Sequence, residues 1–370
     1  MKVGTVKEIK HYEFRVGLTP MNVKEYVARG HEVFVQTGAG AGSSFSDEDY
    51  VAAGATILQT AEEVWAKCDM IVKVKEPLKE EYDLMREDQI IYTYLHLAAD
   101  LPLTKAMLER KVKGVAYETI RDNNGGLPLL KPMSEVAGKL SVQAGARCLE
   151  KIMGGRGVLL GGVPGTSKAN VVVIGGGVVG KSAMKMAIGL GANVTVFDNN
   201  LDTLTTLDDI WGSQIQTLYS TPSAIEAALM DADLVIGAVL IPGGAAPKLI
   251  RKEYLSKMKP GSVIVDVAVD QGGCAETTRA TYHDNPTFVV DGVVHYCVAN
   301  MPGAVSNTST IALTNATLAY GLKIADMGLE AAVKANKNLL PGVNTYKGHL
   351  TEEAVARDFE MEYTDLTTLL

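Results

Sequence analysis

A glycine-rich turn near the middle of the chain constrains its fold more than any other feature. The β-branched run Val171–Ile174 leads into a G-x-G-x-x-G turn, and an apolar helical pattern follows. The three glycines are Gly175, Gly177 and Gly180. In a Rossmann βαβ unit the first glycine permits the tight turn, the second lets a pyrophosphate approach the backbone, and the third lets the helix pack on the strand. The turn therefore predicts a dinucleotide-binding α/β domain.

An acidic residue ends the next β-rich run and indicates which dinucleotide is bound. Asp198 closes the run Val194–Asp198. A carboxylate at this place can accept hydrogen bonds from the adenosine ribose hydroxyls, and it repels a 2′-phosphate. Asn199 and Asn200 bring no positive charge, so the pattern favours NAD over NADP. The alternative is a glycine-rich turn that binds nothing, with Asp198 as an ordinary surface residue.

Length and composition narrow the class of protein. A chain of 370 residues suggests two domains. The net charge is −8 and no basic stripe stands out, so nucleic acid is not expected as a partner. No signal peptide or membrane-spanning run is apparent. We expect a cytoplasmic protein without membrane association, whose scattered cysteines are buried thiols: Cys68, Cys148, Cys274 and Cys297.

Strand and helix signals alternate along most of the chain, which predicts two Rossmann-like, doubly wound α/β domains. The strands expected in the first are Lys2–Val6, His31–Gln36, Ala55–Leu58, Met70–Val74, Gln89–Tyr94 and Gly114–Ala116. Those expected in the second are Val171–Ile174, Asn193–Phe197, Ile215–Tyr219, Leu234–Val239, Val263–Val267 and Val293–Cys297.

Long helices are expected to join the two domains. Ser134 is predicted to cap a helix over Glu135–Met153. Two helical segments follow the second α/β unit, and we expect them to return to the first domain. The prediction is a substrate domain of residues 1–130 plus 307–370 and an NAD-binding domain of residues 131–306, with a ligand cleft between them.

Four polar residues stand where α/β proteins build their sites. Lys75 and His96 each end an apolar strand, and Asp270 follows another on a glycine-flanked turn. Arg15 lies in a loop before a helix, and arginine binds carboxylates bidentately. Each has a plainer interpretation as a solvated lysine or arginine, a structural histidine or a turn aspartate. Asp266, inside its strand, is predicted to be structural.

Several motifs, in this order, resemble the alanine dehydrogenase family, which also includes the α subunit of nicotinamide nucleotide transhydrogenase. The resemblance covers nearly the whole chain, and the bacterial alanine dehydrogenase branch is the nearest match. The motifs are Val3–Glu8, Glu13–Pro20, Val74–Pro77, Tyr94–His96, Lys131–Gly138, the glycine turn, Asp266–Gly273 and Val298–Val305.

The resemblance implies NAD-dependent, reversible oxidative deamination of L-alanine to pyruvate and ammonia by a homohexamer. It implies that Arg15 and Lys75 bind the substrate, that His96 is the acid–base group, and that Asp270 is the second catalytic group. No metal is expected. The implied cofactor contacts are Ser134, Gly175, Gly177, Val178, Val179, Gly180, Asp198, Ser220, Val239, Leu240, Val267, Asp270, Arg279, Val298, Asn300 and Met301.

The sequence departs from the family pattern at two places. Val6 stands where the family has a proline, and Thr203 stands where relatives often have a basic residue, which puts a cofactor contact there in doubt. Three alternatives remain: a transhydrogenase α-like NAD(H)-binding subunit, a saccharopine-forming or related amino-acid dehydrogenase, and a non-catalytic NAD-binding protein. Intact Lys75 and His96 favour alanine dehydrogenase chemistry over the first.

Overall fold

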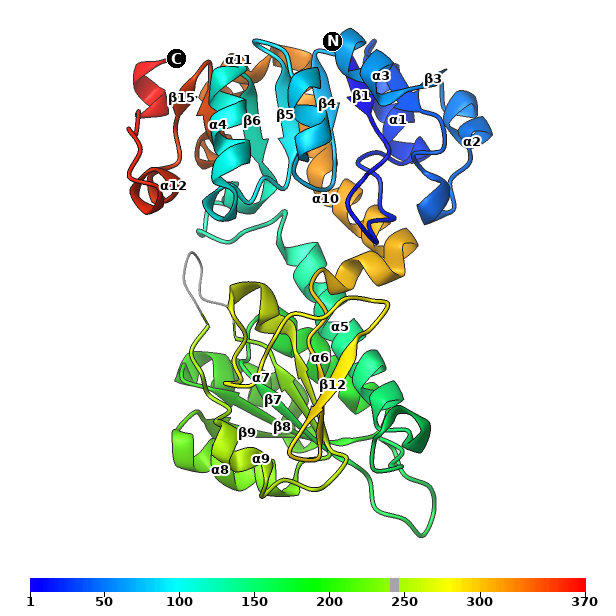
Figure 1. The fold of residues 1–370 in the computed structure, drawn as a ribbon, viewed down its shortest axis with the longest axis vertical. Helices are drawn as coiled ribbons and strands as arrows, with labels where there is room; N and C mark the ends of the chain where they lie inside the picture. Colours follow the sequence, from blue (N-terminus) through cyan, green and yellow to red (C-terminus); the bar gives the residue numbers. More distant parts are fainter. Residues whose placement is uncertain (240–245) are drawn as a thin grey trace. The chain divides into compact units, whose positions relative to one another are not determined.

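The chain folds into two compact α/β units (Figure 1). The computed structural model describes residues 1–239 and 246–370. Unit 1 comprises Met1–Met133 with Gly303–Leu370, and unit 2 comprises Ser134–Pro302. Each unit contains one largely parallel sheet with helices on both faces, so the predicted fold class is confirmed.

The sheet of unit 1 has eight strands: β1 (Lys2–Thr5), β2 (Glu32–Gln36), β3 (Thr56–Leu58), β4 (Met70–Val72), β5 (Ile90–Thr93), β6 (Lys113–Ala116), β14 (Val343–Tyr346) and β15 (His349–Leu350). Their order is β15-β14-β6-β5-β4-β1-β2-β3. From β6 to β3 the strands are parallel, and β14 joins β6 antiparallel. The parallel part has the Rossmann order 3-2-1-4-5-6, so the sheet has a switch point between β1 and β4.

Helices cover both faces of this sheet: α1 (Pro20–Ala28), α2 (Asp47–Ala52), α3 (Ala61–Lys67), α4 (Leu101–Glu109), α10 (Ser306–Met327), α11 (Leu329–Ala335) and α12 (Glu353–Asp358). Residues of α3, α4 and α12 share one core cluster. On the other face α10, orange in Figure 1, packs with α1 and lies behind β4 and β5. Tyr92 Oη donates a hydrogen bond to Thr317 O at 3.0 Å, which ties β5 to α10.

The sheet of unit 2 repeats the same order. Its strands are β7 (Asn170–Ile174), β8 (Asn193–Asp198), β9 (Ile215–Tyr219), β10 (Leu234–Gly237), β11 (Val263–Asp266), β12 (Thr287–Val290) and β13 (Val293–Tyr296). They lie in the order β12-β13-β11-β10-β7-β8-β9, with β12 antiparallel to β13. The parallel strands again read 3-2-1-4-5-6. The helices are α5 (Lys131–Cys148), α6 (Val178–Gly189), α7 (Leu201–Trp211), α8 (Pro222–Asp231) and α9 (Lys252–Leu255).

The long helix α5 differs from its prediction at both ends. It begins at Lys131, so Ser134 lies inside the helix and is not its N-cap. Pro132 explains the earlier start, because proline suits the first helical turn. The helix ends at Cys148 rather than Met153, and a β-carbon on Gly155 would stand 2.2 Å from Cys148 O. The chain therefore doubles back against the end of the helix, where only glycine fits.

Three strands were not predicted: β12, β14 and β15. Each of them pairs antiparallel with its neighbour, at the edge of a sheet whose other strands are parallel.

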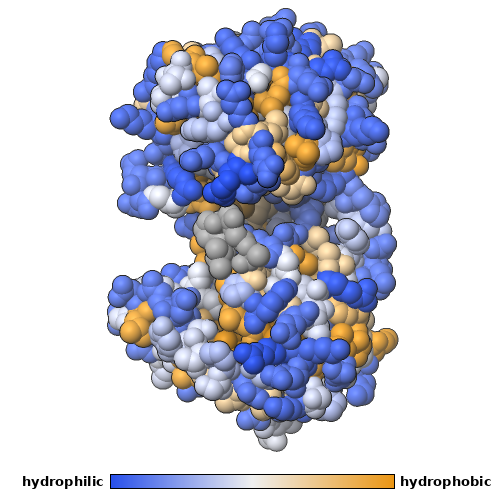
Figure 2. Space-filling view, turned by 60° about the vertical axis from the view of Figure 1, so that its left-hand side comes forward, coloured by the Kyte–Doolittle hydropathy of each residue, from blue (hydrophilic) through white to orange (hydrophobic). Residues whose placement is uncertain are grey.

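Figure 2 shows a surface covered mainly by hydrophilic residues, with apolar residues in small groups. Across the described part of the chain, no helix combines the length and apolarity needed to cross a membrane.

Candidate functional site

Three of the predicted site residues follow three adjacent strands in unit 1: β1 and β4, which border the switch point, and β5 beside β4. Arg15 lies in the loop between β1 and α1, Lys75 follows β4, and His96 follows β5. In open α/β sheets, ligands bind outside the carboxyl ends of the strands at such a point. The topology of unit 1 therefore brings these residues to one edge of its sheet.

The Arg15 guanidinium is buried and held in a fixed orientation. Only 2% of the residue is exposed, and the nearby Glu13 is also buried. Arg15 Nε and Nη2 donate to the two Glu13 carboxylate oxygens at 2.7 and 2.6 Å, and Nη1 contacts Met133 Sδ at 3.0 Å. A bidentate pair of this kind restricts the orientation of the guanidinium plane.

Lys75 lies beside Arg15 on a loop held by buried charges. Burial lowers the pKa of the Lys75 ammonium, and the neighbouring Arg15 guanidinium lowers it further. The backbone N–H groups of Val74 and Lys75 donate to Glu8 Oε1 at 2.6 and 3.2 Å. Lys73 Nζ in turn contacts Glu8 Oε2 at 3.1 Å. Lys75 is therefore a half-buried cation whose backbone is fixed by hydrogen bonds to Glu8. An anionic ligand would be attracted to this charge.

His96 is held through both its backbone and its ring. Its φ of 49° is left-handed, and its N–H donates to Glu118 Oε1 at 2.6 Å. The ring Nδ1 lies 3.2 Å from Glu76 Oε2. The other oxygen of Glu76 pairs with Lys10. The side chain is 43% exposed, so the ring combines fixed orientation with access to a ligand.

The glycine turn of unit 2 has the geometry that its sequence predicts. Gly175 has a φ of 106°, and its N–H donates to Phe197 O at 2.8 Å. A β-carbon on Gly180 would stand 1.7 Å from Gly175 O, so α6 packs directly on the turn. A β-carbon on Gly177, by contrast, would meet nothing within 4 Å. Gly177 is also exposed at the start of α6, and no side chain caps this helix. The open space and the helix N–H groups suit a pyrophosphate.

Gly177 offers a direct test of this interpretation. We expect Gly177→Ala to leave folding intact, because its β-carbon meets only open space and its φ of −71° suits alanine. NADH binding should weaken roughly tenfold or more, because the added methyl keeps a pyrophosphate from the backbone. The matched control is Gly189→Ala, since a β-carbon there also meets nothing within 4 Å. Fluorescence titration with NADH and thermal unfolding check both variants; an unchanged Kd in Gly177→Ala would contradict the assignment.

Asp198 lies at the end of β8 and is fixed by backbone donors. Gly176 N–H donates to Oδ2 at 2.7 Å, and Asn200 N–H donates to Oδ1 at 2.8 Å. These bonds set the plane of the carboxylate beside the glycine turn and leave further lone pairs for ribose hydroxyls.

The other predicted cofactor contacts fall into two groups. Most form a loop group, which lies in loops and short 3₁₀ helices after the carboxyl ends of strands in unit 2, the edge that also carries the glycine turn. Ser134 lies in α5, and Arg279 packs over the Phe288 ring at 4.2 Å. Leu240 is outside the described residues. The residues of the loop group are Ser220, Val239, Val267, Asp270, Val298, Asn300 and Met301.

The two aspartates after β11 have different surroundings. Asp266 is buried, and it accepts hydrogen bonds from the backbone of Ala268, Cys274 and Ala275 at 2.8–3.2 Å. It therefore organises the following turn, as predicted. Asp270 is exposed on a short 3₁₀ helix, Val267–Gln271, and is accessible to a ligand.

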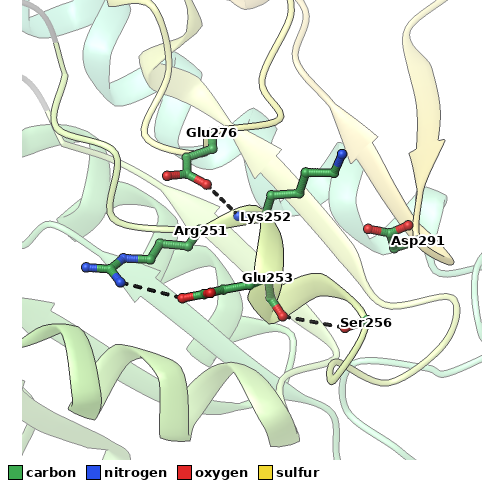
Figure 3. A pocket seen from close by; sticks show the side chains of 6 residues that line it. All are labelled: Arg251, Lys252, Glu253, Ser256, Glu276 and Asp291. Atoms are coloured by element: carbon green, nitrogen blue, oxygen red, sulfur yellow. Dashed lines mark hydrogen bonds and ion pairs between the residues drawn. The ribbon is translucent and has the colours of Figure 1, made fainter.

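A separate groove lies elsewhere in unit 2 (Figure 3). It includes Asp291, which precedes β13 at the sheet edge opposite the cofactor candidates. Its charged groups contact one another: Arg251 pairs with Glu253, and Lys252 N–H donates to Glu276 at 2.8 Å. None of the residues that line this groove is a predicted site residue. Within the described ranges, no group of three or more His, Cys, Asp or Glu residues could hold a metal ion.

The carboxylates that support the site were not predicted from the sequence. Glu8, Glu13, Glu76 and Glu118 hold Lys75, Arg15 and His96 in place. Glu13 and Glu76 lie within two residues of the predicted ligand-binding cations Arg15 and Lys75. That closeness in sequence could have indicated ion pairs that support the site.

Comparison with known proteins places both units in one family. Residues 4–137 match the N-terminal domain model of alanine dehydrogenase/PNT, and residues 141–353 match the C-terminal domain model. The alanine dehydrogenase of Methanococcus maripaludis is 55% identical over 365 residues, which are 98% of each chain.

Solved structures give the same relationship. An L-alanine dehydrogenase superposes with a TM-score of 0.95 at 52% identity, covering 97% of this chain and 99% of the other. A transhydrogenase from Sinorhizobium meliloti superposes with a TM-score of 0.82 at 25% identity, covering 96% and 100%.

Proposed function

This chain belongs to the alanine dehydrogenase/PNT family, and we propose that it catalyses the reversible, NAD-dependent oxidative deamination of L-alanine to pyruvate and ammonia. One observation carries the proposal: the cations Arg15 and Lys75 lie at the same sheet edge as His96, whose ring is held by a carboxylate. The greater likeness to alanine dehydrogenase than to transhydrogenase supports it.

The two cations suit a small amino acid or 2-oxo acid. In the proposed reaction Arg15 binds the carboxylate through its guanidinium group, and Lys75 donates a hydrogen bond to the 2-oxo oxygen. The lowered pKa of Lys75 eases transfer of its hydrogen-bonding proton toward a developing oxyanion. Binding both the carboxylate and the 2-oxo oxygen fixes the orientation of the carbon that reacts. Such positioning supplies much of the rate enhancement in reactions of this kind.

The proton transfers fall to His96 and Asp270. The chemistry that NAD supplies when bound is acceptance of the hydride from the alanine Cα. Water then adds to the carbon of the iminium ion, and ammonia leaves from the resulting carbinolamine. His96 and Asp270 take up the proton of the attacking water and return one to the departing nitrogen. In the reverse direction the same groups serve reductive amination.

The residues of unit 2 fit NAD rather than NADP. The open space at Gly177 and the uncapped start of α6 suit the pyrophosphate. Asp198 has its carboxylate fixed beside them, where it would repel a 2′-phosphate. We also propose a cytoplasmic homohexamer that needs no metal. The four buried, unpaired thiols support a reducing compartment, and the family resemblance supports the hexamer, which light scattering would check.

The direct test is NADH formation, followed by absorbance, from NAD and a panel of amino acids. L-Alanine should be the best substrate, with weaker turnover of serine and 2-aminobutyrate because one methylene costs only ~1–3 kcal/mol in such a pocket. NADP should react poorly. Tight NADH binding without alanine turnover would favour the non-catalytic or transhydrogenase-like alternatives, and preference for another amino acid would favour a related dehydrogenase.

A further inference from the structure

The ring of His96 is supported by a carboxylate that the proposed reaction does not consume. Glu76 is 8% exposed, and its Oε2 lies 3.2 Å from His96 Nδ1. Burial opposes ionisation of Glu76, but His96, Lys75 and Lys10 together hold the pKa of this carboxyl well below its usual range. Glu76 is therefore a carboxylate at neutral pH and can only accept hydrogen bonds.

A carboxylate acceptor at Nδ1 determines where the imidazole proton lies. In neutral histidine one ring nitrogen donates and the other accepts, and the partner of one nitrogen sets the role of the other. Among residues 1–239 and 246–370, Nε2 has no hydrogen-bond partner. The His96 N–H donates to Glu118 Oε1 at 2.6 Å, which fixes the backbone from which the ring projects.

We propose that Glu76 is a positioning residue that keeps the His96 proton on Nδ1, so that Nε2 is the atom that exchanges protons with the substrate. The inference rests on the proposed alanine dehydrogenase function. Nε2 takes the proton that water loses as its oxygen bonds to the substrate carbon and the C=N electron pair moves to nitrogen. Nε2 returns that proton to the nitrogen as the carbon–nitrogen bond breaks and the hydroxyl oxygen forms the C=O bond. The remaining hydroxyl proton passes to the released ammonia, which leaves as ammonium, so His96 and Glu76 end unchanged.

A double-mutant cycle tests whether Glu76 acts through His96. Glu76→Gln offers an amide whose NH₂ can donate to Nδ1 and so favour the other tautomer. It should lower kcat roughly 10- to 100-fold, within the range of general acid–base catalysis. KM for alanine should change less than about twofold, because substrate binding is not altered. The double variant with His96→Asn should be no slower than His96→Asn alone; multiplying effects would overturn the proposal.

Glu80→Gln is the matched control, since Glu80 is an exposed acid in the 3₁₀ helix Lys79–Leu84 and its substitution removes the same charge. It should retain normal kcat. Thermal unfolding and NADH affinity should match the wild type in every variant. If Glu76→Gln does not fold, Glu76→Asp keeps the charge on a side chain one methylene shorter, and the same cycle with His96→Asn applies.

Nitrogen NMR of protein carrying ¹⁵N-histidine tests the inference without turnover. His96 is assigned by the signals lost in His96→Asn, and the neutral imidazole form is recorded. The wild type should show the proton on Nδ1, and Glu76→Gln should shift the population toward Nε2. A wild-type ring with its proton on Nε2 would overturn the inference. A wild type without alanine turnover but with the Nδ1 proton would refute the proposed function alone.

Discussion

Replacing His96 with asparagine is expected to lower kcat for alanine oxidation by about 10²- to 10⁴-fold, the usual contribution of general acid–base catalysis. Asparagine is the informative substitution because it tolerates the left-handed backbone at this position, where φ is 49°. The N–H bond to Glu118 also survives. The loss should therefore report proton transfer and not a rearranged loop.

Two comparisons make this prediction specific. NADH affinity should stay at the wild-type value, because His96 and the glycine turn belong to different units of the chain. His349→Asn removes an exposed histidine of β15 in the same unit and should leave kcat unchanged. Steady-state kinetics with both variants settle the matter: if His96→Asn kept near-normal turnover, the mechanism above would be wrong.

Lys73→Met is expected to cause the largest loss of stability. Lys73 is fully buried, and Nζ lies 3.1 Å from Glu8 and 2.8 Å from Glu81. Burial alone would lower the pKa of this ammonium, but the two carboxylates more than compensate and raise it. Removing one partner of a buried ion pair typically costs about 3–5 kcal/mol, because the charge left behind has lost its compensation. We expect unit 1 to lose that much free energy of unfolding.

Trp65 gives a local readout for this prediction. It is fully buried in α3 of unit 1, and the other tryptophan, Trp211, lies in unit 2. Urea unfolding followed by fluorescence in a Trp211→Phe background, at fixed protein concentration, reports unit 1. Lys79→Met removes an exposed lysine nearby and should change the free energy by no more than about 0.5 kcal/mol. An equally small effect in Lys73→Met would contradict the proposed cost.

The loss in Lys73→Met should also depend on pH. Burial, with help from Glu81, raises the pKa of Glu8 even while Lys73 opposes the shift. A folded-state pKa above the unfolded value means that the folded state binds protons more readily, so lowering the pH favours folding through that group. Without Lys73, nothing from that side chain opposes the shift, so the pKa of Glu8 in the folded state rises further. The destabilisation should therefore shrink as the pH falls toward the range in which carboxylates take up protons.

Local patterns predicted the fold class and the glycine turn well. Gly175 has a φ that other residues rarely adopt, and Gly180 has no space for a β-carbon. Such positions demand glycine, so their spacing can be recognised from sequence alone. The family was also predicted correctly, because its motifs run along the whole chain.

Long-range partners could not be predicted in the same way. Glu8 is 66 residues from Val74, and Glu118 is 22 residues from His96. Only the order of strands in the sheet brings these carboxylates to the loops that they hold. The added strand β14 is equally dependent on tertiary structure, because it pairs with β6 from more than two hundred residues away. The roles assigned to the site residues in both units stay predictions.

In the proposed reaction the hydride passes directly from the Cα of L-alanine to NAD. The sharpest measurement uses L-alanine deuterated at C2, with NADH analysed by mass spectrometry and NMR. We expect one deuterium on the nicotinamide C4 of each NADH, one pyruvate for each NADH, and slower turnover than with ordinary alanine. NADH that carries no deuterium, or no NADH formed from alanine, would contradict it.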